Sequence, residues 1–566
     1  MSSPSAASWR FRPRLIDNLA GYSLARFGRD CASGATVAVV ALPLAMAFGI
    51  ASGVTPDAGL FTAIIAGLCI SALGGSRVQI GGPAGAFIVV VFGIIQQHGL
   101  ANLLIATMLA GLLLFAMGAL RLGNLIRFIP VSVVIGFTNG IAVLIALSQF
   151  KDLLGLAIPK MPGEFFEQLH ALWAARASFN PWALAVASGG LAIMFTWPKP
   201  PSATALVPRW RRFAAMLPAP LAVLVATTTA VWLLDIPVST IGSRFGGIPQ
   251  ALPAPDLPEF HWATVRQLFG PIVTIALLCA IESLLCARVA DGLLGEHHDP
   301  NQELMAQGVA NFVTPLFGGI PATGTIARTL TNVRAGATSP VAGIAHALFL
   351  LVIVLVAAPL AAHVPLAGLA AILLFVAWNM GEWREFVKAR AFSNNYRIIL
   401  VSTFLLTVVL DLSVAVEVGL VLSAAFFITR VASLTEAAPV ELTPDESAYG
   451  RVAACRLYGS LFFGSVGKVE ALSNAASARV VIVDLTRLIN LDTTGAEALR
   501  EWLDNQRRAG GDLVLFGANP QPRSLIERSG LLAELGADHL QPDRAAALAL
   551  AWKLAGADGS ASATQG

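Results

Sequence analysis

"VQIGGPAGAFIVVVFGII", from Val78 to Ile95, joins helix-breaking residues to an unbroken apolar run. A polar Gln79 and two glycines precede Pro83, which opens a hydrophobic stretch shorter than the ~20 residues that a membrane-crossing helix needs. Proline is suited to the first turn of a helix, where its missing N–H is not required. The stretch therefore predicts a short helix whose N-terminus lies inside the membrane.

The composition of the 566 residues is that of an integral membrane protein. Hydrophobic side chains make up 56% of the chain and charged ones 13%, and the mean hydropathy is +0.72. A soluble domain has roughly 25% charged residues. The apolar stretches are continuous and helix-length instead of alternating, so the predicted fold is a multi-span α-helical membrane protein.

Apolar segments recur along the first 434 residues. The fourteen segments span residues 32–53, 58–74, 83–96, 100–120, 129–150, 181–197, 217–235, 268–290, 303–318, 325–334, 340–358, 363–378, 397–411 and 414–432. The third and the tenth are short, are preceded by Gly and Pro, and occupy the same place in two halves of seven. Because seven is odd, the halves run in opposite directions. We therefore predict a 7+7 inverted repeat with two half-helices.

Basic residues are concentrated in the loops that this threading places on one side of the membrane. They are Arg77, Arg121, Arg127, the cluster "RWRR" at 209–212 and the loop "GEWREFVKAR" at 381–390. By the positive-inside rule this side, which also holds the N-terminus, is cytoplasmic. No short apolar region with a cleavage site follows the basic start, so the N-terminus is expected to be retained. We expect a multi-pass protein of the inner (plasma) membrane.

The two short segments predict an anion site. "GGPAGAF" opens the third segment and "GGIPATGTIARTL" opens the tenth. In inverted-repeat transporters, interrupted helices at corresponding positions point to the binding site. Their N-termini combine positive dipole ends with unpaired N–H groups, and Arg328 adds a charge that is costly inside a membrane without a function. The alternative is that these glycines only allow close helix packing.

Five motifs in order resemble the SulP anion transporters, the sulfate permease family. They are "LPLAMAFGIASGV" (42–54), "GGSRVQIGGPAGAF" (74–87), "IESLLCARVADG" (281–292), "NQELMAQGVANFVTPLFGGIPATGTIARTLTNVRAG" (301–336) and "VVIVDLTRLINLDTTGAEAL" (480–499). The resemblance implies a core domain of segments 1–4 and 8–11 that moves by an elevator-like motion against a gate domain of segments 5–7 and 12–14. It also implies a homodimer and a cytoplasmic STAS domain.

The resemblance also implies the residues of the anion pocket. These are Leu44, Phe48, Ala84, Gly85, Ala327 and Arg328. Animal members of the family commonly have Gln in place of Leu44 and Phe in place of Ala84, so a chloride-type pocket is not implied. The smaller Ala84 leaves room for a larger oxyanion.

Glu282 lies near the middle of the eighth segment. A carboxylate there is costly unless it is paired or protonated, so it is either an interhelical hydrogen-bonding partner or the coupling-ion site. Sodium requires several oxygen ligands, and the neighbouring Cys286, Gly324 and Ile326 have no side-chain oxygen. Backbone carbonyls could replace them, which leaves Na+ as the alternative. We predict H+ as the coupling ion.

The chain becomes soluble in character after the last segment. The predicted domains are an N-terminal segment 1–30, a transport domain 31–434, a linker 435–450, a STAS domain 451–555 with α/β alternation, and a disordered tail 556–566. Thr494 matches the phosphorylated position of bacterial STAS proteins, so phosphorylation or a cytoplasmic regulator is one reading. The other is a capping box formed with Glu497.

The predicted function is secondary active transport of a sulfate, bicarbonate or dicarboxylate type of anion by proton symport. The alternatives are a sodium-coupled bicarbonate transporter and an uncoupled anion exchanger or channel. An enzyme or receptor with a membrane anchor is disfavoured, and no nucleotide-binding motif is present. The five cysteines lack paired or metal-like spacing, and His297 and His298 lack further ligands, so no cofactor, metal site or nucleic-acid partner is expected.

Overall fold

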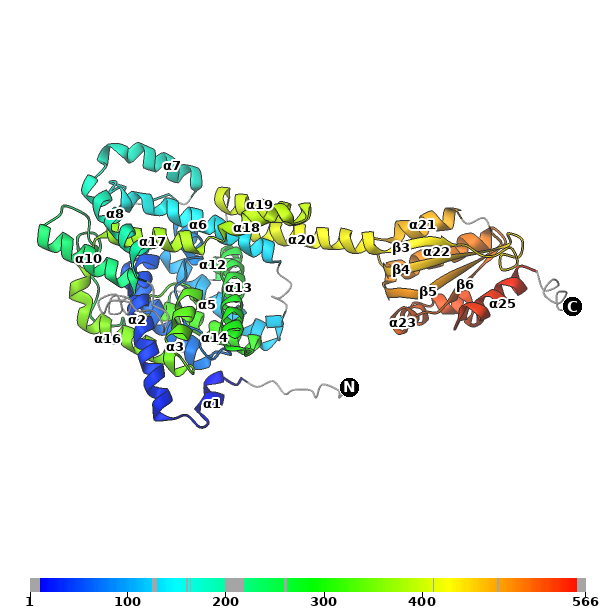
Figure 1. The fold of residues 1–566 in the computed structure, drawn as a ribbon, viewed down its shortest axis with the longest axis horizontal. Coiled ribbons are helices and arrows are strands. Elements are labelled where there is room, and N and C mark those ends of the chain that lie inside the picture. The colour runs from blue at the N-terminus through cyan, green and yellow to red at the C-terminus, as the bar shows by residue number, and fades with distance from the viewer. Residues whose placement is uncertain are drawn as a thin grey trace. The chain divides into compact units, whose positions relative to one another are not determined.

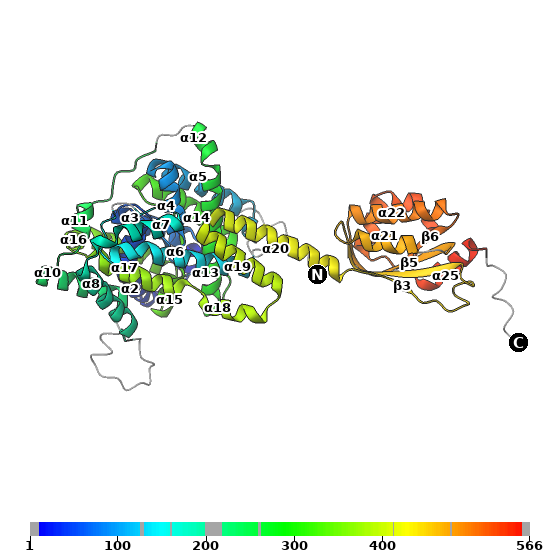
Figure 2. The same ribbon diagram turned by 90° about the horizontal axis from the view of Figure 1, so that it is seen from above.

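The computed structural model describes residues 11–124, 130–158, 161–162, 164–198, 218–258, 262–410, 412–475 and 478–556. Arg127, the cluster at 209–212 and all but the first residue of the predicted tail lie outside these ranges. The chain divides into two compact units, Met1–Leu420 and Val421–Gly566, which are described separately. Figure 1 and Figure 2 show that the first unit is helical and that the second contains a sheet.

The first unit is built from helices. They are α1 Arg14–Leu19, α2 Leu24–Ala51, α3 Pro56–Leu73, α4 Phe87–His98, α5 Leu100–Ala119, α6 Val131–Leu153, α7 Phe165–Ala174, α8 Pro181–Thr196, α10 Ala219–Leu234, α11 Ile241–Phe245, α12 Trp262–Gln267, α13 Phe269–Leu294, α14 Pro300–Val313, α15 Ile326–Arg334, α16 Val341–Ala361, α17 Leu366–Met380, α18 Trp383–Lys388 and α19 Asn394–Val409. Helix α20, Leu412–Leu434, crosses the boundary between the units.

Each of the fourteen predicted apolar segments corresponds to one of these helices. The matching helices are α2–α6, α8, α10, α13–α17, α19 and α20. In the described part of the chain, eight helices, or nine if a bent pair is counted as one span, are long and apolar enough to cross a membrane. The multi-span α-helical membrane fold is therefore confirmed.

The two predicted half-helices are the short helices α4 and α15, and each follows a two-residue strand. Strand β1, Gly81–Gly82, pairs antiparallel with β2, Thr323–Gly324. The N–H of Thr325 donates to the carbonyl oxygen of Ile80 at 2.8 Å and extends the pairing. Extended backbone inside a membrane needs partners for its N–H and C=O groups, and here the two interrupted segments supply them to each other.

The helices pack in two groups, here called the core helices (α2–α5 and α13–α16) and the gate helices (α6, α8, α10, α17 and α19). Small residues permit the closest contacts within each group. In the core helices, a Cβ atom at Gly111 of α5 would lie 2.7 Å from the carbonyl oxygen of Gly308 of α14. In the gate helices, a Cβ atom at Gly140 of α6 would lie 2.6 Å from Cβ of Thr407 of α19.

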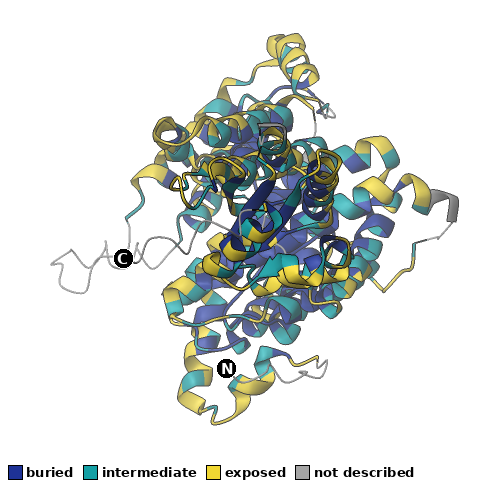
Figure 3. Ribbon diagram, turned by 90° about the vertical axis from the view of Figure 1, so that its right-hand side faces the viewer, coloured by how far each residue is buried: buried dark blue, intermediate teal, exposed yellow. Residues whose placement is uncertain are grey.

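The second unit is a five-stranded sheet with helices on both faces. Its elements are β3 Glu436–Val440, β4 Val452–Leu461, α21 Val466–Ala475, β5 Val480–Leu491, α22 Thr493–Arg508, β6 Asp512–Phe516, α23 Pro520–Arg528, α24 Leu531–Leu535, β7 Leu540–Gln541 and α25 Arg544–Leu554. The strand order is β3-β4-β5-β6-β7, with only the β3–β4 pair antiparallel. Alternate residues of the first half of β5, 480–485, pack with α22 on one face and α25 on the other, which buries both faces of this part of the strand. Figure 3 shows the burial along the ribbon, with buried residues in dark blue.

The range 435–450, expected to be a linker, is corrected by the structure. It contains β3, which pairs with β4 from Glu436 opposite Tyr458 to Val440 opposite Ala454. The sequence reads as a loop because it is short, contains Pro439 and has little apolar character. Proline is tolerated at the edge of a sheet, where its missing N–H breaks no ladder.

The capping box predicted at Thr494 and Glu497 is also corrected. The residue that caps α22 is Asp492, whose Oδ1 accepts a hydrogen bond from the N–H of Gly495 at 2.7 Å. Thr494 lies exposed within the first turn, and Glu497 forms an ion pair with Arg500. Aspartate and threonine are both good capping residues, so the sequence leaves the choice open and the backbone conformation decides it.

We expect Asp492→Ala to lower the free energy of unfolding of the sheet unit by about 1 kcal/mol, because the N–H groups at the start of α22 lose their acceptor. Thr494→Ala is the matched control and should change it by less than about 0.5 kcal/mol. Urea unfolding of a fragment that begins at Thr435 measures both. Equal destabilisation by the two substitutions would contradict the assignment of Asp492 as the cap.

Candidate functional site

The paired strands β1 and β2 lead into the starts of α4 and α15, where the predicted pocket residues lie. Ala84 and Gly85 are buried in the short connection between β1 and α4. Ala327 is exposed in the first turn of α15, whereas the next residue, Arg328, is 1% exposed. The structure thus brings the two predicted half-helix starts together through the β1–β2 pair.

The Arg328 guanidinium is enclosed beside β1. Its Nη2 donates to the carbonyl oxygen of Pro83 at 3.4 Å, which is a long hydrogen bond. Its Nε and Nη1 are buried without a hydrogen-bond partner among the described residues. A Cβ atom at Gly82 would overlap Nη1, so only glycine at this position permits the approach. A buried cation with unused donors has the chemistry of an anion ligand.

Leu44 and Phe48 are one turn apart on α2 and are both buried. A Cβ atom at Gly85 would lie 3.7 Å from Cε1 of Phe48, so these two predicted pocket residues are neighbours. The same Cβ atom would lie 3.3 Å from Sδ of Met380 and 3.5 Å from Cδ1 of Ile145. Gly85 therefore sits where a core helix start meets the gate helices α17 and α6.

Glu282, the predicted coupling residue, lies on α13 and is partly exposed. Its Oε2 is buried without a hydrogen-bond partner among the described residues. Two cysteines on either side of it fix α13 to the interrupted segment: Sγ of Cys279 donates to the carbonyl oxygen of Ala322 at 3.3 Å, and Sγ of Cys286 lies 3.2 Å from Oγ1 of Thr329. These contacts hold Glu282 close to the start of α15.

Glu303 on α14 is a second buried carboxylate, which the sequence analysis did not single out. Its Oε2 accepts hydrogen bonds from the N–H groups of Gly75 and Ser76 at 3.0 and 3.2 Å. Its Oε1 accepts hydrogen bonds from Oγ of Ser283 at 3.2 Å and Nε2 of Gln307 at 3.0 Å. The run "NQELMAQG" contained a signal, because polar residues one turn apart in a membrane segment need partners.

Asn332 anchors the buried face of α15. Its Oδ1 accepts a hydrogen bond from Oγ of Ser33 on α2 at 2.7 Å, and its Nδ2 donates to the carbonyl oxygen of Val78 at 2.9 Å. One turn earlier, Oγ1 of Thr329 accepts a hydrogen bond from the N–H of Ile80 at 3.0 Å. Helix α15 is thereby fixed to α2 and to the segment before β1.

The loop that follows α15 is held by Asp30 at the start of α2. Asp30 is 0% exposed and accepts hydrogen bonds from the N–H of Thr338 at 2.5 Å, from Oγ of Ser339 at 2.5 Å and from the hydroxyl of Tyr22 at 2.6 Å. Burial, together with the hydrogen bond to Asp30, raises the pKa of Tyr22 to about 12. Both ends of α15 are therefore attached to other core helices.

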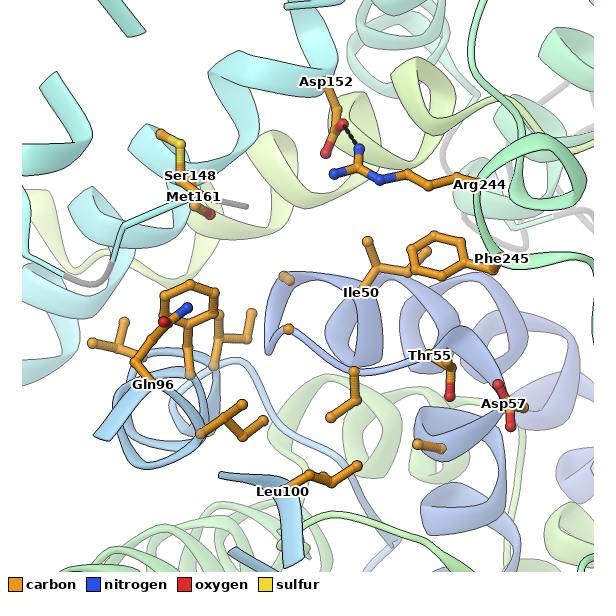
Figure 4. A pocket seen from close by; sticks show the side chains of 18 of the residues that line it. Ile50, Thr55, Asp57, Gln96, Leu100, Ser148, Asp152, Met161, Arg244 and Phe245 are labelled. Carbon is orange, nitrogen blue, oxygen red and sulfur yellow. Dashed lines mark hydrogen bonds and ion pairs between the residues drawn. The ribbon is translucent and has the colours of Figure 1, made fainter. Parts of the chain in front are cut away.

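A cavity of about 600 Å³ opens between core and gate helices next to this site (Figure 4). Its lining includes Ile50 of α2, Ile88 of α4, Lys151 and Asp152 of α6, and Arg244 of α11. Figure 4 shows Asp152 and Arg244 directed toward one another, and their ion pair measures 3.1 Å. Ile88 lies one turn beyond Gly85, so the cavity ends beside the predicted pocket without containing any of its residues.

The chain matches the sulfate permease family over residues 27–403 and the STAS domain over residues 444–547. A protein of Bacillus subtilis (strain 168) that bears the name of a sulfate transporter, YvdB, is 40% identical over 538 residues, which cover 93% of this chain and 98% of YvdB.

Two solved structures have related folds. One is the transmembrane domain of a cyanobacterial bicarbonate transporter, BicA, which is 32% identical in sequence and has a TM-score of 0.62. The match covers 70% of this chain and 98% of the BicA chain. Murine Solute Carrier 26 family member A9, an anion transporter, has a TM-score of 0.83 at 18% identity and covers 97% of this chain and 96% of its own, which shows the shared fold. The chain therefore belongs to the sulfate permease family of membrane anion transporters and carries a C-terminal STAS domain.

Proposed function

We propose that this protein is a secondary active transporter that carries a small oxyanion or carboxylate together with a proton. The observation that carries this proposal is the unpartnered, buried Oε2 of Glu282 in a core where other buried polar groups fix the interrupted helices. Sulfate, bicarbonate and C4-dicarboxylates are the candidate substrates. The names of the relatives, sulfate and bicarbonate transporters, support the first two.

Anion binding is assigned to the two half-helix starts and Arg328. The N–H groups at the starts of α4 and α15 carry partial positive charge, and their antiparallel pairing directs both toward the same region. Arg328 adds a full charge with two unused donors. Leu44, Phe48 and Ala84 form an apolar pocket wall. The N–H groups and Arg328 would therefore hold an anion in surroundings of low dielectric constant, where electrostatic attraction is strong.

The contrast between the carboxylates of Glu282 and Glu303 supports the proposal of proton coupling. Glu303 accepts four hydrogen bonds, which stabilise it in one arrangement. Glu282 has an oxygen without a partner, and a proton neutralises such a carboxylate at lower cost than leaving it charged. Protonation as the anion binds would reduce the net charge that moves with the core.

The similarity to a bicarbonate transporter favours bicarbonate as one alternative substrate. The alternative coupling ion is Na+, which no relative's name supports. Cys286 contacts Thr329 and has no oxygen to offer, while Ile326 is exposed. A sodium ion there would depend on the Glu282 carboxylate, the hydroxyl of Thr329 and backbone carbonyls. An uncoupled exchanger or channel is the remaining alternative, and it gives Glu282 no role.

We further propose an elevator-like movement of the core helices against the gate helices, in a homodimer of the plasma membrane with the STAS domain in the cytoplasm. The gate-helix side chains that face Gly85, Ile145 and Met380, are apolar, and apolar contacts are exchanged at lower cost than buried hydrogen bonds. A regulatory role of Thr494 is consistent with its exposure on α22. We expect the contact between protomers to lie near the STAS domain, α19 and α20, and disulfide crosslinks that form only through core helices would contradict this.

Arg328→Ala should raise the half-saturating anion concentration about tenfold to a hundredfold, because a charge-assisted contact to the anion is lost. Uptake of radiolabelled sulfate, bicarbonate and succinate into proteoliposomes identifies the substrate and then measures this value. Arg334→Ala, which removes an exposed arginine of the same helix, is the control and should leave the value unchanged. Unchanged affinity in Arg328→Ala removes this residue from the site.

Glu282→Gln should retain anion exchange but lose accumulation driven by a proton gradient. Glutamine keeps the size and a hydrogen-bonding end but cannot release a proton, so it imitates the protonated state. Uptake with and without an imposed pH gradient measures both activities, and Glu167→Gln, at an exposed position of α7, is the control. Sodium-dependent accumulation in the wild type, or full pH-driven accumulation in Glu282→Gln, would refute proton coupling.

Gly85→Val should lower the transport rate about tenfold or more. A Cβ atom at this position already lies 3.3 Å from Sδ of Met380, a tight contact, and the two further methyl groups of valine would also crowd Phe48 and Ile145. Gly93→Val on the same segment is the matched control, since nothing lies within 4 Å of a Cβ atom there. Equal rates in the two variants would show that Gly85 does not line the path of substrate or core movement.

A further inference from the structure

His346 lies on α16 behind the anion site and is 0% exposed. Both ring nitrogens, Nδ1 and Nε2, are buried without a hydrogen-bond partner among the described residues. A neutral imidazole carries one donor and one acceptor, and leaving both unused in a membrane protein costs free energy. An apolar residue of similar size would fill the space without this cost, so the presence of histidine calls for a function.

The His346 ring lies against α3 beside β1. A Cβ atom at Gly67 of α3 would lie 3.6 Å from both Cε1 and Nδ1 of the ring, and 3.3 Å from the carbonyl oxygen of Gly81 in β1. On its other side, a Cβ atom at Gly34 of α2 would lie 2.8 Å from the backbone nitrogen of His346. Glycines therefore allow α2 and α3 to close on this position and keep it enclosed.

Arg328 approaches the same turn of α3. A Cβ atom at Gly82 would overlap Nη1 of Arg328 and would lie 3.4 Å from Cα of Ala63, one turn before Gly67. The charge of Arg328 also acts electrostatically on the His346 ring. The unpartnered Nε and Nη1 of Arg328 are donors, and the imidazole offers a lone pair, so the unmet groups are complementary.

We propose that His346 is a positioning residue for Arg328. Its neutral ring accepts a hydrogen bond from the guanidinium through one bridging water molecule and holds Arg328 beside Pro83 at the start of α4. A carboxylate in this place would also accept the hydrogen bond, but it would cancel the charge that the anion requires. A neutral acceptor leaves that charge available. The inference rests on the proposed anion site and extends it to a residue that has no contact with substrate.

The test compares three substitutions of His346 in the full-length protein in proteoliposomes, with radiolabelled sulfate or bicarbonate, whichever the wild type accumulates. His346→Leu removes the acceptor at similar volume, His346→Gln keeps a neutral acceptor, and His346→Glu introduces a charged one. We expect the half-saturating concentration to rise about tenfold in His346→Leu with an unchanged maximal rate, and to stay within about twofold of wild type in His346→Gln. His346→Glu should weaken binding most.

A double-mutant comparison separates this role from a packing role. In the Arg328→Ala background, His346→Leu should cause no further rise, because the residue that His346 positions is absent. Independent, multiplying effects of the two substitutions would overturn the proposal, as would wild-type affinity in His346→Leu. Size-exclusion chromatography and thermal unfolding show whether His346→Leu folds. If it does not, the comparison of His346→Gln with His346→Glu is the test, and equal anion affinity in these two variants would overturn the proposal. Wild-type affinity in Arg328→Ala would instead contradict the anion site itself.

Discussion

The need to satisfy backbone polar groups away from water governs the centre of this protein. Two membrane segments are interrupted by extended residues, and their N–H and C=O groups would be unpaired in lipid. The β1–β2 pair, Gly81–Gly82 with Thr323–Gly324, solves this problem by joining segments about 240 residues apart in the chain. Because each interruption needs the other, the two half-helix starts are brought together. The anion site proposed above would be a consequence of this pairing.

Polar side chains around the pairing fall into two classes. Glu303, Asn332 and Asp30 each have several hydrogen bonds and attach the interrupted segments to the core helices. Glu282, Arg328 and His346 each keep buried polar atoms without a partner among the described residues. Since a buried polar group without a partner is costly, the first class is explained by stability and the second calls for a function. This contrast, and not burial alone, is the basis for proposing Glu282 as the coupling carboxylate and Glu303 as a structural one.

The sequence predicted the fourteen helices because membrane segments are apolar over lengths that no loop shares, and it predicted the two half-helices because Gly and Pro interrupt them. It missed β3, whose pairing depends on a partner strand and not on its own residues, and it misplaced the cap of α22 at Thr494, where Asp492 was an equal candidate. It could propose Glu282 and Arg328 from their charge in apolar surroundings. Glu303 was overlooked although the polar spacing of its run was a signal. His346 could not be identified, because whether a polar residue is satisfied depends on contacts between helices far apart in the chain.

The distribution of these contacts also bears on movement. The hydrogen bonds that anchor α15, from Ser33 to Asn332 and from Asn332 to Val78, connect core helices to one another. The gate-helix side chains that lie nearest to Gly85 at the start of α4, Ile145 and Met380, are apolar. Directional bonds resist relative displacement, whereas apolar surfaces can slide from one packing to another at small cost. An anion held by the half-helix starts would therefore travel with the core as one rigid piece, and the apolar boundary with the gate is where movement would be accommodated.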